Sequence, residues 1–196
     1  MKQLYIYGAS GHGLVVAEVA KNCGYEKIIF IDDGDNIYLT FEDIKNNNNI
    51  PIAFGIGNNT IRKKLFEKVK EYDFHVPHLT HPSAIISPNV DIGEGTVIMP
   101  HVVVNTKSHI GRGVILNTAS IIEHENVIGN FVHISPNVAL AGNVCIYEET
   151  HIGIGSCVIQ GIKIGKNCTI GAGSVVIRDI ENKKVAYGNP CTEIKE

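Results

Sequence analysis

A hydrophobic repeat with a period of six residues dominates the second half of the chain. From Ile86 to Val176 every sixth residue is Ile, Leu or Val, at sixteen successive positions. An α-helix repeats its apolar stripe every three or four residues and an ordinary strand every two, so neither explains this spacing. The strict hexad predicts a parallel β-helix, in which each short strand points one aliphatic side chain inward before the chain turns a corner.

Three hexads make one triangular coil, so the repeat predicts about five coils stacked about 4.8 Å apart. Glycine often follows the aliphatic residue, and a small Thr or Ser recurs four residues after it. These residues suit tight corners and a narrow interior. The unbroken register predicts that no long loop leaves the prism. Residues 185–190 break the hexad, and we expect them to cap the open end.

Residues 1–80 follow a different pattern, in which short apolar runs alternate with helical periodicity. The predicted elements are strands over 4–7, 27–31 and 50–55, helices over 14–22 and 60–72, and a last short strand over 75–79. This order predicts a Rossmann-like βαβ unit with parallel strands. We therefore expect two domains: an α/β domain over 1–80, and a β-helix over 81–196 that includes the C-terminal cap.

Composition narrows the classes of partner. Seventeen basic and twenty acidic side chains give a net charge of −3 without a polybasic patch, so we expect neither nucleic acid nor an anionic membrane surface as a partner. No signal-like segment or apolar stretch long enough to span a membrane is present. The five cysteines are scattered and form no C-x-x-C pair, which is typical of the reducing cytoplasm.

A glycine-rich loop, Gly8 to Gly13, lies between the first predicted strand and helix. Backbone N–H groups at a helix N-terminus can face an anion, but the G-x-x-G-x-G spacing is not the dinucleotide fingerprint. Asp32 and Asp33 close the next strand, where an acid commonly binds ribose hydroxyls. Gly57 and Asn58 follow the third strand on the same rim. The pattern favours a nucleotide pocket over its alternative, a plain α/β turn.

His124 is the strongest candidate for catalysis. It lies between Glu123 and Glu125, two residues after the inward Ile122, and so on an exposed position of its coil. An adjacent carboxylate can fix the tautomer of an imidazole and raise its basicity, as a general base requires. A solvated histidine beside two surface acids is the alternative reading of this triplet.

His133 and His151 are three hexads apart, which is one full coil. We expect both to project from the same edge, one above the other. Such a stack can bind a metal, as in β-helical carbonic anhydrases. A catalytic zinc ion generally needs three protein ligands, however, and only two histidines align, so we expect no metal centre.

Four segments together resemble one enzyme family. The run from Tyr7 to Gly13, Asn117, the Glu123-His124-Glu125 triplet and the stretch from Ala141 to Asn143 are similar to the bacterial hexapeptide-repeat sugar O- and N-acyltransferases. Within that family, which includes sialic acid O-acetyltransferases, the likeness is greatest to the UDP-4-amino-sugar N-acetyltransferases of bacillosamine biosynthesis. The resemblance implies a left-handed β-helix, a homotrimer, and acetyl-CoA lying between two prisms.

The resemblance also implies a reaction and a role for each matching residue. Acetyl would pass from acetyl-CoA to the 4-amino group of a UDP-linked 4-amino-4,6-dideoxy sugar. His124 would be the general base, oriented by Glu125. The substrate-binding residues would be Gly11, His12, Gly13, Asp32, Asp33, Gly57, Asn58 and Asn117. The acetyl-CoA-binding residues would be His133, Gly142, Ile154, Gly171 and Gly173, with the Gly142 N–H donating to the thioester oxygen.

Three other functions remain open from the sequence. O-acetylation of sialic acid or a related sugar would use the same fold and a similar base. A zinc enzyme of the carbonic anhydrase type would use His133 and His151. A non-catalytic protein that binds sugar nucleotides would need only the N-terminal pocket.

Overall fold

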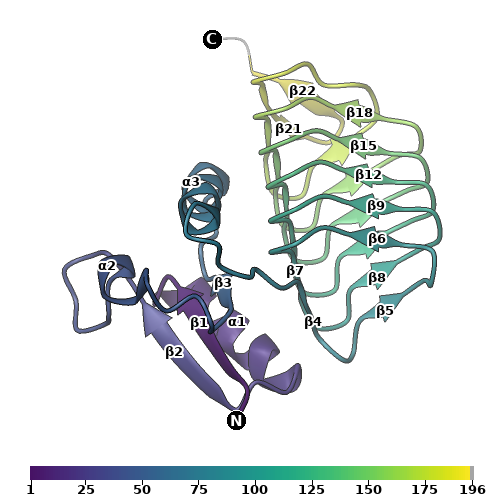
Figure 1. Cartoon of the computed structure of the whole chain (residues 1–196). Helices are drawn as coiled ribbons and strands as arrows, with labels where there is room; N and C mark the ends of the chain where they lie inside the picture. The colour runs from purple at the N-terminus through teal and green to yellow at the C-terminus, as the bar shows by residue number, and fades with distance from the viewer. Residues whose placement is uncertain (195–196) are drawn as a thin grey trace.

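The computed structural model describes residues 1–194 and contains an α/β part followed by a β-solenoid (Figure 1). The α/β part has a parallel three-stranded sheet in the order β2-β1-β3, as predicted. Its strands are β1 Gln3–Tyr7, β2 Lys27–Ile31 and β3 Ile52–Phe54. Its helices are α1 Gly11–Asn22, α2 Phe41–Ile44 and α3 Asn59–Lys70.

Three details of this part differ from the prediction. Helix α1 begins at Gly11 rather than at residue 14, because Ser10 is extended and its carbonyl already accepts the N–H of Leu14. The short helix α2 was not predicted; a capping box of Thr40 and Asp43 begins it. The predicted strand over 75–79 is wrong, because residues 75–78 form no strand and the next strand already belongs to the solenoid.

The solenoid has three faces, each a parallel sheet built mostly from strands of two residues. We call them the first, second and third face in chain order. The first face contains β4 Leu79–Thr80, β7 Val97–Ile98, β10 Ile115–Leu116, β13 His133–Ile134, β16 His151–Ile152, β19 Thr169–Ile170 and β21 Val185–Gly188. The second face contains β5 Ile85–Ile86, β8 Val103–Val104, β11 Ile121–Ile122, β14 Ala139–Leu140, β17 Cys157–Val158 and β20 Val175–Val176. The third face contains β6 Asp91–Ile92, β9 His109–Ile110, β12 Val127–Ile128, β15 Cys145–Ile146 and β18 Lys163–Ile164.

Neighbouring strands of one face pair at a spacing of three hexads, as in Leu116 with Ile134. The second residue of nearly every strand points inward, so the hexad fills the interior of the prism, and Ile122 and Ile134 are fully buried. Small hydroxyl side chains at the corners bond to the next coil; Thr96 Oγ1, for example, donates to the carbonyl of Gly111 at 2.7 Å. These contacts explain why the repeat is strict.

The solenoid has about six turns, one more than the hexad count predicts. The first coil begins at Leu79, before the aliphatic repeat starts. The last coil, at the other end, is shorter than three hexads. Ile164 pairs with Ile180 and Ile170 with Ala186, which shows the shortening. Strand β22 Cys191–Glu193 then pairs antiparallel with β21 and covers the last coil. Figure 1 shows this end of the solenoid far from the N-terminal sheet.

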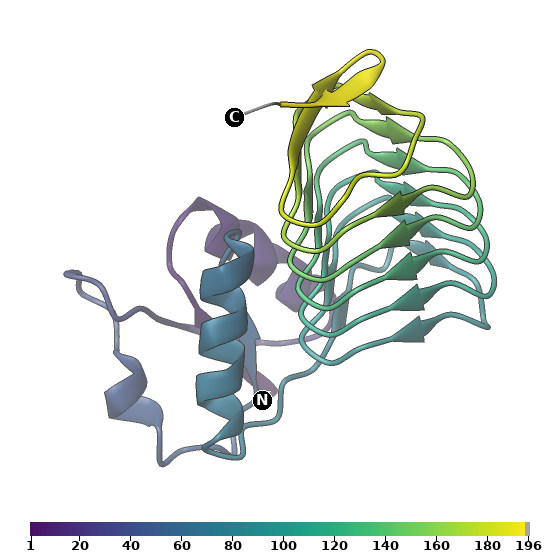
Figure 2. The same cartoon turned by 90° about the horizontal axis from the view of Figure 1, so that it is seen from above.

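The three corners of the prism carry most of the predicted site residues of the solenoid. The first corner joins the first and second faces and includes 117–120, 153–156 and 171–174. The second corner joins the second and third faces and includes 123–126 and 141–144. The third corner joins the third and first faces and includes 111–114, 129–132 and 147–150. Helix α3 lies alongside the third corner, and both views place it beside the coils (Figures 1 and 2).

A single buried side chain, Arg62 on α3, joins the two parts of the chain. It is 1% exposed. Its Nε donates to the carbonyl of Gly113 at 2.8 Å, and one Nη donates to that of Phe131 at 3.0 Å. The remaining N–H groups donate to the carbonyls of Ile56 and Gly57 and to the side chain of Asn59. All five guanidinium donors are therefore used, and none of these acceptors is a carboxylate.

Apolar and ionic contacts extend this junction along α3. The rings of Phe66 and Phe131 meet edge to face with centroids 5.4 Å apart. Lys63 forms an ion pair of 2.6 Å with Glu149. No helix within residues 1–194 has the length and apolar content that a membrane crossing requires.

We expect Arg62→Met to lower the free energy of unfolding by about 3 kcal/mol or more. Methionine fills a similar volume, but the carbonyls of Gly113 and Phe131 then lose their donor. Denaturant titration of both proteins measures the difference. Lys64→Met is the matched control, because Lys64 is exposed on the same helix. Equal losses in the two variants would contradict the role of Arg62 as the link between the domains.

Candidate active site

Two glycine-containing loops meet at the carboxyl edge of the three-stranded sheet. A Cβ on Gly13 would overlap the carbonyl oxygen of Gly8, and one on Gly55 would lie 2.5 Å from the Gly13 Cα. These glycines therefore allow the two loops to touch. Gly11 and Gly57 differ, because a Cβ on either would meet nothing within 4 Å. The predicted substrate residues Gly11 and Gly57 thus border open space, whereas Gly13 is required by packing.

Asp32 holds the loops at this edge. Its carboxylate accepts the N–H of Ala9 at 3.0 Å and that of Gly34 at 2.9 Å. A third bond comes from the side chain of Asn36. The two backbone N–H groups hold the pKa of Asp32 below its usual value.

Asp33 is engaged in the same way on the other side of the strand. It accepts the N–H of Phe41 at 2.8 Å, the Tyr7 hydroxyl, and the Lys68 ammonium at 3.1 Å. Burial alone would raise the pKa of Asp33, but these donors outweigh it and lower that pKa. Each predicted substrate carboxylate therefore already has protein partners, and contact with a nucleotide stays a prediction for both.

Three histidines gather between the glycine loops and the first face. His12, near the start of α1, lies with its ring centroid 6.2 Å from that of His133. The rings of His133 and His151 are parallel and 4.7 Å apart. The stacking of these two histidines, predicted from their spacing of one coil, is confirmed. The position of His12 beside them does not follow from the hexad spacing.

The hydrogen bonds of His133 fix its tautomer. Its Nδ1 lies 3.3 Å from the carbonyl of Gly57, which can only accept, so Nδ1 carries the proton. Its Nε2 lies 3.3 Å from the side-chain nitrogen of Asn117 and accepts from that amide. Both ring nitrogens are thus occupied in the neutral form. Within residues 1–194 no group of three His, Cys, Asp or Glu side chains is arranged to hold a metal.

The cluster is held neutral at physiological pH. Burial, helped by His151, Arg62 and His12, lowers the pKa of His133 to about 3. Burial and then the Arg62 charge lower the pKa of His12 to about 4, and the pKa of His151 also falls, chiefly through burial. These side chains therefore offer hydrogen-bonding groups, not positive charge.

A cavity of about 250 Å³ lies between the N-terminus of α3 and the solenoid. The predicted residues Gly57 and Asn58 line it together with His151. Asn58 is also the N-cap of α3, where its side chain accepts the N–H of Ile61 at 3.0 Å. The hollow between the α/β part and the solenoid thus contains two of the predicted substrate residues.

His124 occupies the second corner of the prism. Its side chain is 55% exposed, as predicted, and its Nδ1 lies 3.1 Å from the carboxylate of Glu125. The other neighbouring acid, Glu123, instead accepts from the side chain of Asn105 at 2.9 Å. Gly142 lies one coil above His124, and the imidazole covers it. His124, Glu125 and Gly142 therefore form one group.

The remaining predicted residues lie on the opposite side of the second face. Asn117, Ile154, Gly171 and Gly173 are at the first corner, next to His133 on the first face. The second corner, with His124, is the corner opposite the first face. A single chain therefore divides the predicted site into two groups that lie apart.

An apolar strip separates these groups. The outward residue of every strand of the second face is apolar: Ile85, Val103, Ile121, Ala139, Cys157 and Val175. Ile85 is 67% exposed and Ile121 is 40% exposed. The strip runs along the whole solenoid between the first and second corners.

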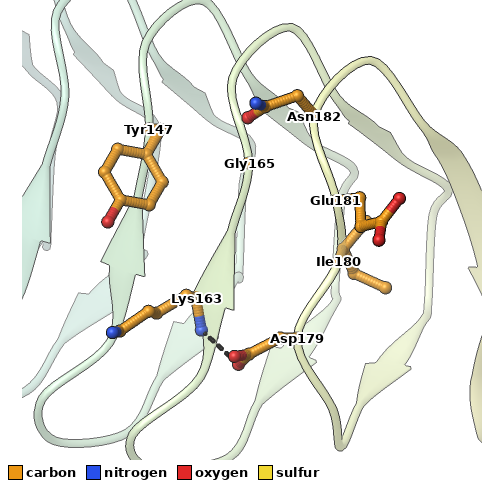
Figure 3. Close-up of a pocket in the computed structure, with 7 residues that line it drawn as sticks. All are labelled: Tyr147, Lys163, Gly165, Asp179, Ile180, Glu181 and Asn182. Atoms are coloured by element: carbon orange, nitrogen blue, oxygen red, sulfur yellow. Dashed lines mark hydrogen bonds between the residues drawn. The ribbon is translucent and has the colours of Figure 1, made fainter.

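A second hollow, of about 410 Å³, lies on the last coils of the third face (Figure 3). Its lining includes Tyr147, Lys163 and Asp179. The Asp179 side chain accepts the backbone N–H of Lys163 at 2.8 Å. None of the predicted site residues lines this hollow, which adjoins the shortened last coil.

The sequence interpretation missed Arg62. A cation on a helix usually indicates an exposed face. The available signal was its place on the apolar stripe of α3, since Arg62, Phe66 and Val69 are the buried residues of that helix.

Comparison with known proteins shows similarity over the whole chain. Residues 3–69 match the family described as the PglD N-terminal domain. The UDP-N-acetylbacillosamine N-acetyltransferase of Bacillus subtilis is 36% identical over 114 residues, which are 50% of this chain. That match spans about half the length of the curated relative, 52%.

Solved structures match the chain more completely. The acetyltransferase domain of PglB from Neisseria gonorrhoeae is 38% identical, with 99% of this chain and 100% of that one covered and a TM-score of 0.93. A variant of the GDP-perosamine N-acetyl transferase of Caulobacter crescentus, solved with CoA and GDP-perosamine, is 30% identical, covers 99% and 97%, and has a TM-score of 0.94. The agreement confirms the predicted left-handed β-helix.

We expect the free energy of unfolding to fall as the pH drops below about 6.5. The folded chain keeps His133 and His12 neutral, whereas the unfolded chain takes up protons there, so acid favours unfolding at up to about 1.4 kcal/mol per pH unit for each histidine. Denaturant titrations between pH 7 and pH 5 measure the slope. His133→Gln should make it shallower, and the exposed His78→Gln controls for loss of a histidine. An unchanged slope in His133→Gln would contradict the neutral state of His133.

Proposed function

The chain belongs to the hexapeptide-repeat sugar N-acetyltransferases with a PglD-type N-terminal domain, and we propose that it acetylates the 4-amino group of a UDP-linked 4-amino-4,6-dideoxy sugar. Acetyl-CoA is the donor. The Bacillus subtilis relative is named for a UDP-linked sugar, and the Caulobacter crescentus relative was solved with a GDP-linked one. A comparison of UDP-linked and GDP-linked acceptors therefore tests the nucleotide directly.

The observation that carries the proposal is the division of the site between two corners flanking an apolar strip. Burying that strip between copies favours self-association. In a homotrimer with the strips facing the three-fold axis, the second corner of one subunit meets the first corner of the next. His124 of one subunit then faces Asn117 and His133 of its neighbour. Each site would thus be built by two subunits, with acetyl-CoA in the groove between them.

The rim of the N-terminal sheet suits the sugar nucleotide. The N-termini of α1 and α3 both point to this rim, and neither helix carries an acidic residue in its first turn. Helix N-termini favour phosphate. We assign Gly11, His12, Gly13, Gly57 and Asn58 to this end of the substrate, and Asp32 and Asp33 to the nucleoside end.

The groove between prisms suits acetyl-CoA. His133, Ile154, Gly171 and Gly173 would contact it from one subunit and Gly142 from the next. No hydrogen bond within residues 1–194 engages the N–H of Gly142, so this donor is available for the thioester oxygen. Asn117 would place the amine of the acceptor.

The chemistry follows from the state of His124. Glu125 binds Nδ1, so Nε2 is left to accept a proton. The sugar nitrogen attacks the thioester carbonyl, a C–N bond forms, and the Gly142 N–H stabilises the oxyanion. The C–S bond then breaks. His124 takes the proton released from the nitrogen and gives it to the departing CoA thiolate, which leaves as the free thiol.

We place the reaction in the cytoplasm. All five cysteines are free thiols, as expected in a reducing compartment.

We expect His124→Ala to lower kcat by about 10²–10⁴-fold with little change in KM, because it removes the base and leaves both binding regions in place. Release of CoA thiol measures the reaction with UDP-linked and GDP-linked 4-amino sugars and with free sialic acid. His109→Ala, a change of an exposed histidine on the third face, is the control. Full activity in His124→Ala would rule out the base, and a preference for sialic acid would overturn N-acetylation.

Subunit mixing tests the shared site. His12→Ala damages the histidine cluster around His133, and His124→Ala damages the second corner, so each variant alone should be nearly inactive. Co-expressed in equal amounts, they should restore about a quarter of the sites, because a site is intact when both contributing subunits are intact at the corner they supply. Co-expression of His124→Ala with Glu125→Gln is the control mixture, since no subunit in it has an intact second corner. Equal recovery in both mixtures would contradict a site shared between subunits.

A further inference from the structure

The imidazole of His124 lies directly beside Gly142. The backbone N–H of Asn143, next to Gly142, donates to the carbonyl of His124 at 2.9 Å, so the two coils are in register here. A Cβ on Gly142 would lie 2.5 Å from both Cε1 and Nε2 of the imidazole and 3.1 Å from Nδ1. The ring therefore occupies the space in which a side chain at residue 142 would begin.

The backbone does not require glycine at this position. In the four central coils the left-handed φ angle at the second corner falls on the next residue, as at Glu125 with +61° and Asn143 with +56°. Gly142 is not among the residues with positive φ. On the neighbouring coils the equivalent residues all carry side chains: Thr106, His124 and Gln160. The imidazole of His124 is thus the feature that needs a residue without a Cβ.

Two contacts together define where the ring lies. The Glu125 carboxylate lies 3.1 Å from Nδ1 on one side, and Cε1 and Nε2 occupy the space beside Gly142 in which a Cβ would lie. A half-exposed imidazole has several rotamers of similar energy, and one hydrogen bond to a surface carboxylate selects among them weakly. The surface of Gly142 adds a van der Waals contact that only one orientation makes.

We propose that Gly142 is a positioning residue for His124, acting through its missing side chain as well as any contact of its N–H with the thioester. The empty space lets the ring lie against the coil while Nδ1 reaches Glu125, and Nε2 then stays at the edge of the groove. Any Cβ would push the ring outward and away from Glu125. The proposal rests on the assignment of His124 as the base.

Alanine separates the two roles, because Gly142→Ala keeps the N–H and adds only the methyl group. The exposed ring can rotate away, so we expect the melting temperature to change little. A base displaced by about 1 Å typically costs up to about 10²-fold, so kcat should fall by about 10- to 100-fold with KM for both substrates nearly constant. Gln160→Ala, one coil above at the same corner position, is the matched control and should keep parental activity.

A double-mutant cycle decides whether Gly142 acts through His124. In the His124→Ala background, Gly142→Ala should change the residual activity by less than about twofold, since no ring is left to displace. An equal loss in both backgrounds would overturn the proposal and assign Gly142 to the cofactor alone. Parental activity in Gly142→Ala would overturn it as well.

A measurement without turnover distinguishes this inference from the proposed reaction. The imidazole NMR resonances of His124 should move in Gly142→Ala and stay in place in Gln160→Ala. If His124→Ala keeps full activity, the base assignment fails, yet the shift of these resonances would still report the steric contact. Unmoved resonances would show that Gly142 does not set the position of the ring.

Discussion

The arrangement of the whole molecule depends on one buried cation. Arg62 uses every donor it has on carbonyl and amide oxygens from both domains, so neither the β3–α3 loop nor the third corner can shift without breaking several bonds. No carboxylate neutralises it among those partners, and burial lowers the pKa of its guanidinium. The positive charge of Arg62 disfavours protonation of His12 and His133. The contact that joins the α/β part to the solenoid thus adds to the effect of burial in keeping these histidines neutral.

The solenoid was predictable because the packing of its interior requires an aliphatic side chain at every sixth residue. Each inward position is surrounded by aliphatic side chains of the neighbouring coils, so Ile122 or Leu140 cannot be replaced by a polar residue without leaving that group unpaired. The same reasoning fails at the ends. Pairing of Ile170 with Ala186 follows from a local shortening of the chain, which no hydrophobic period reports. The three parallel strands and two long helices of the α/β part were predicted in order and type, but the short helix α2, which begins at a capping box, was missed, and the strand over 75–79 was wrong.

The site was only partly predictable, for a similar reason. Exposure of His124 and stacking of His133 on His151 both follow from position within a coil of three hexads. The same count, applied to Asn117 and His124, also places them on different corners, because they are separated by slightly more than one hexad. The resemblance gave each residue a role and placed acetyl-CoA between two prisms, but it did not say which residues each prism supplies. The internal partners of Asp33 and the burial of Arg62 depend on contacts between distant segments, which a single sequence does not reveal.

Because strands pair at intervals of three hexads, positions along the solenoid axis are evenly spaced. Every coil adds one strand spacing, about 4.8 Å, to each corner, so the distance from His124 to the C-terminal cap is set by a whole number of coils. An insertion of one or two hexads would keep the aliphatic side chains inward but would move every following residue to another face and corner of the prism. The reach of such a chain along a bound molecule can therefore change only in steps, and each step preserves the geometry at both corners.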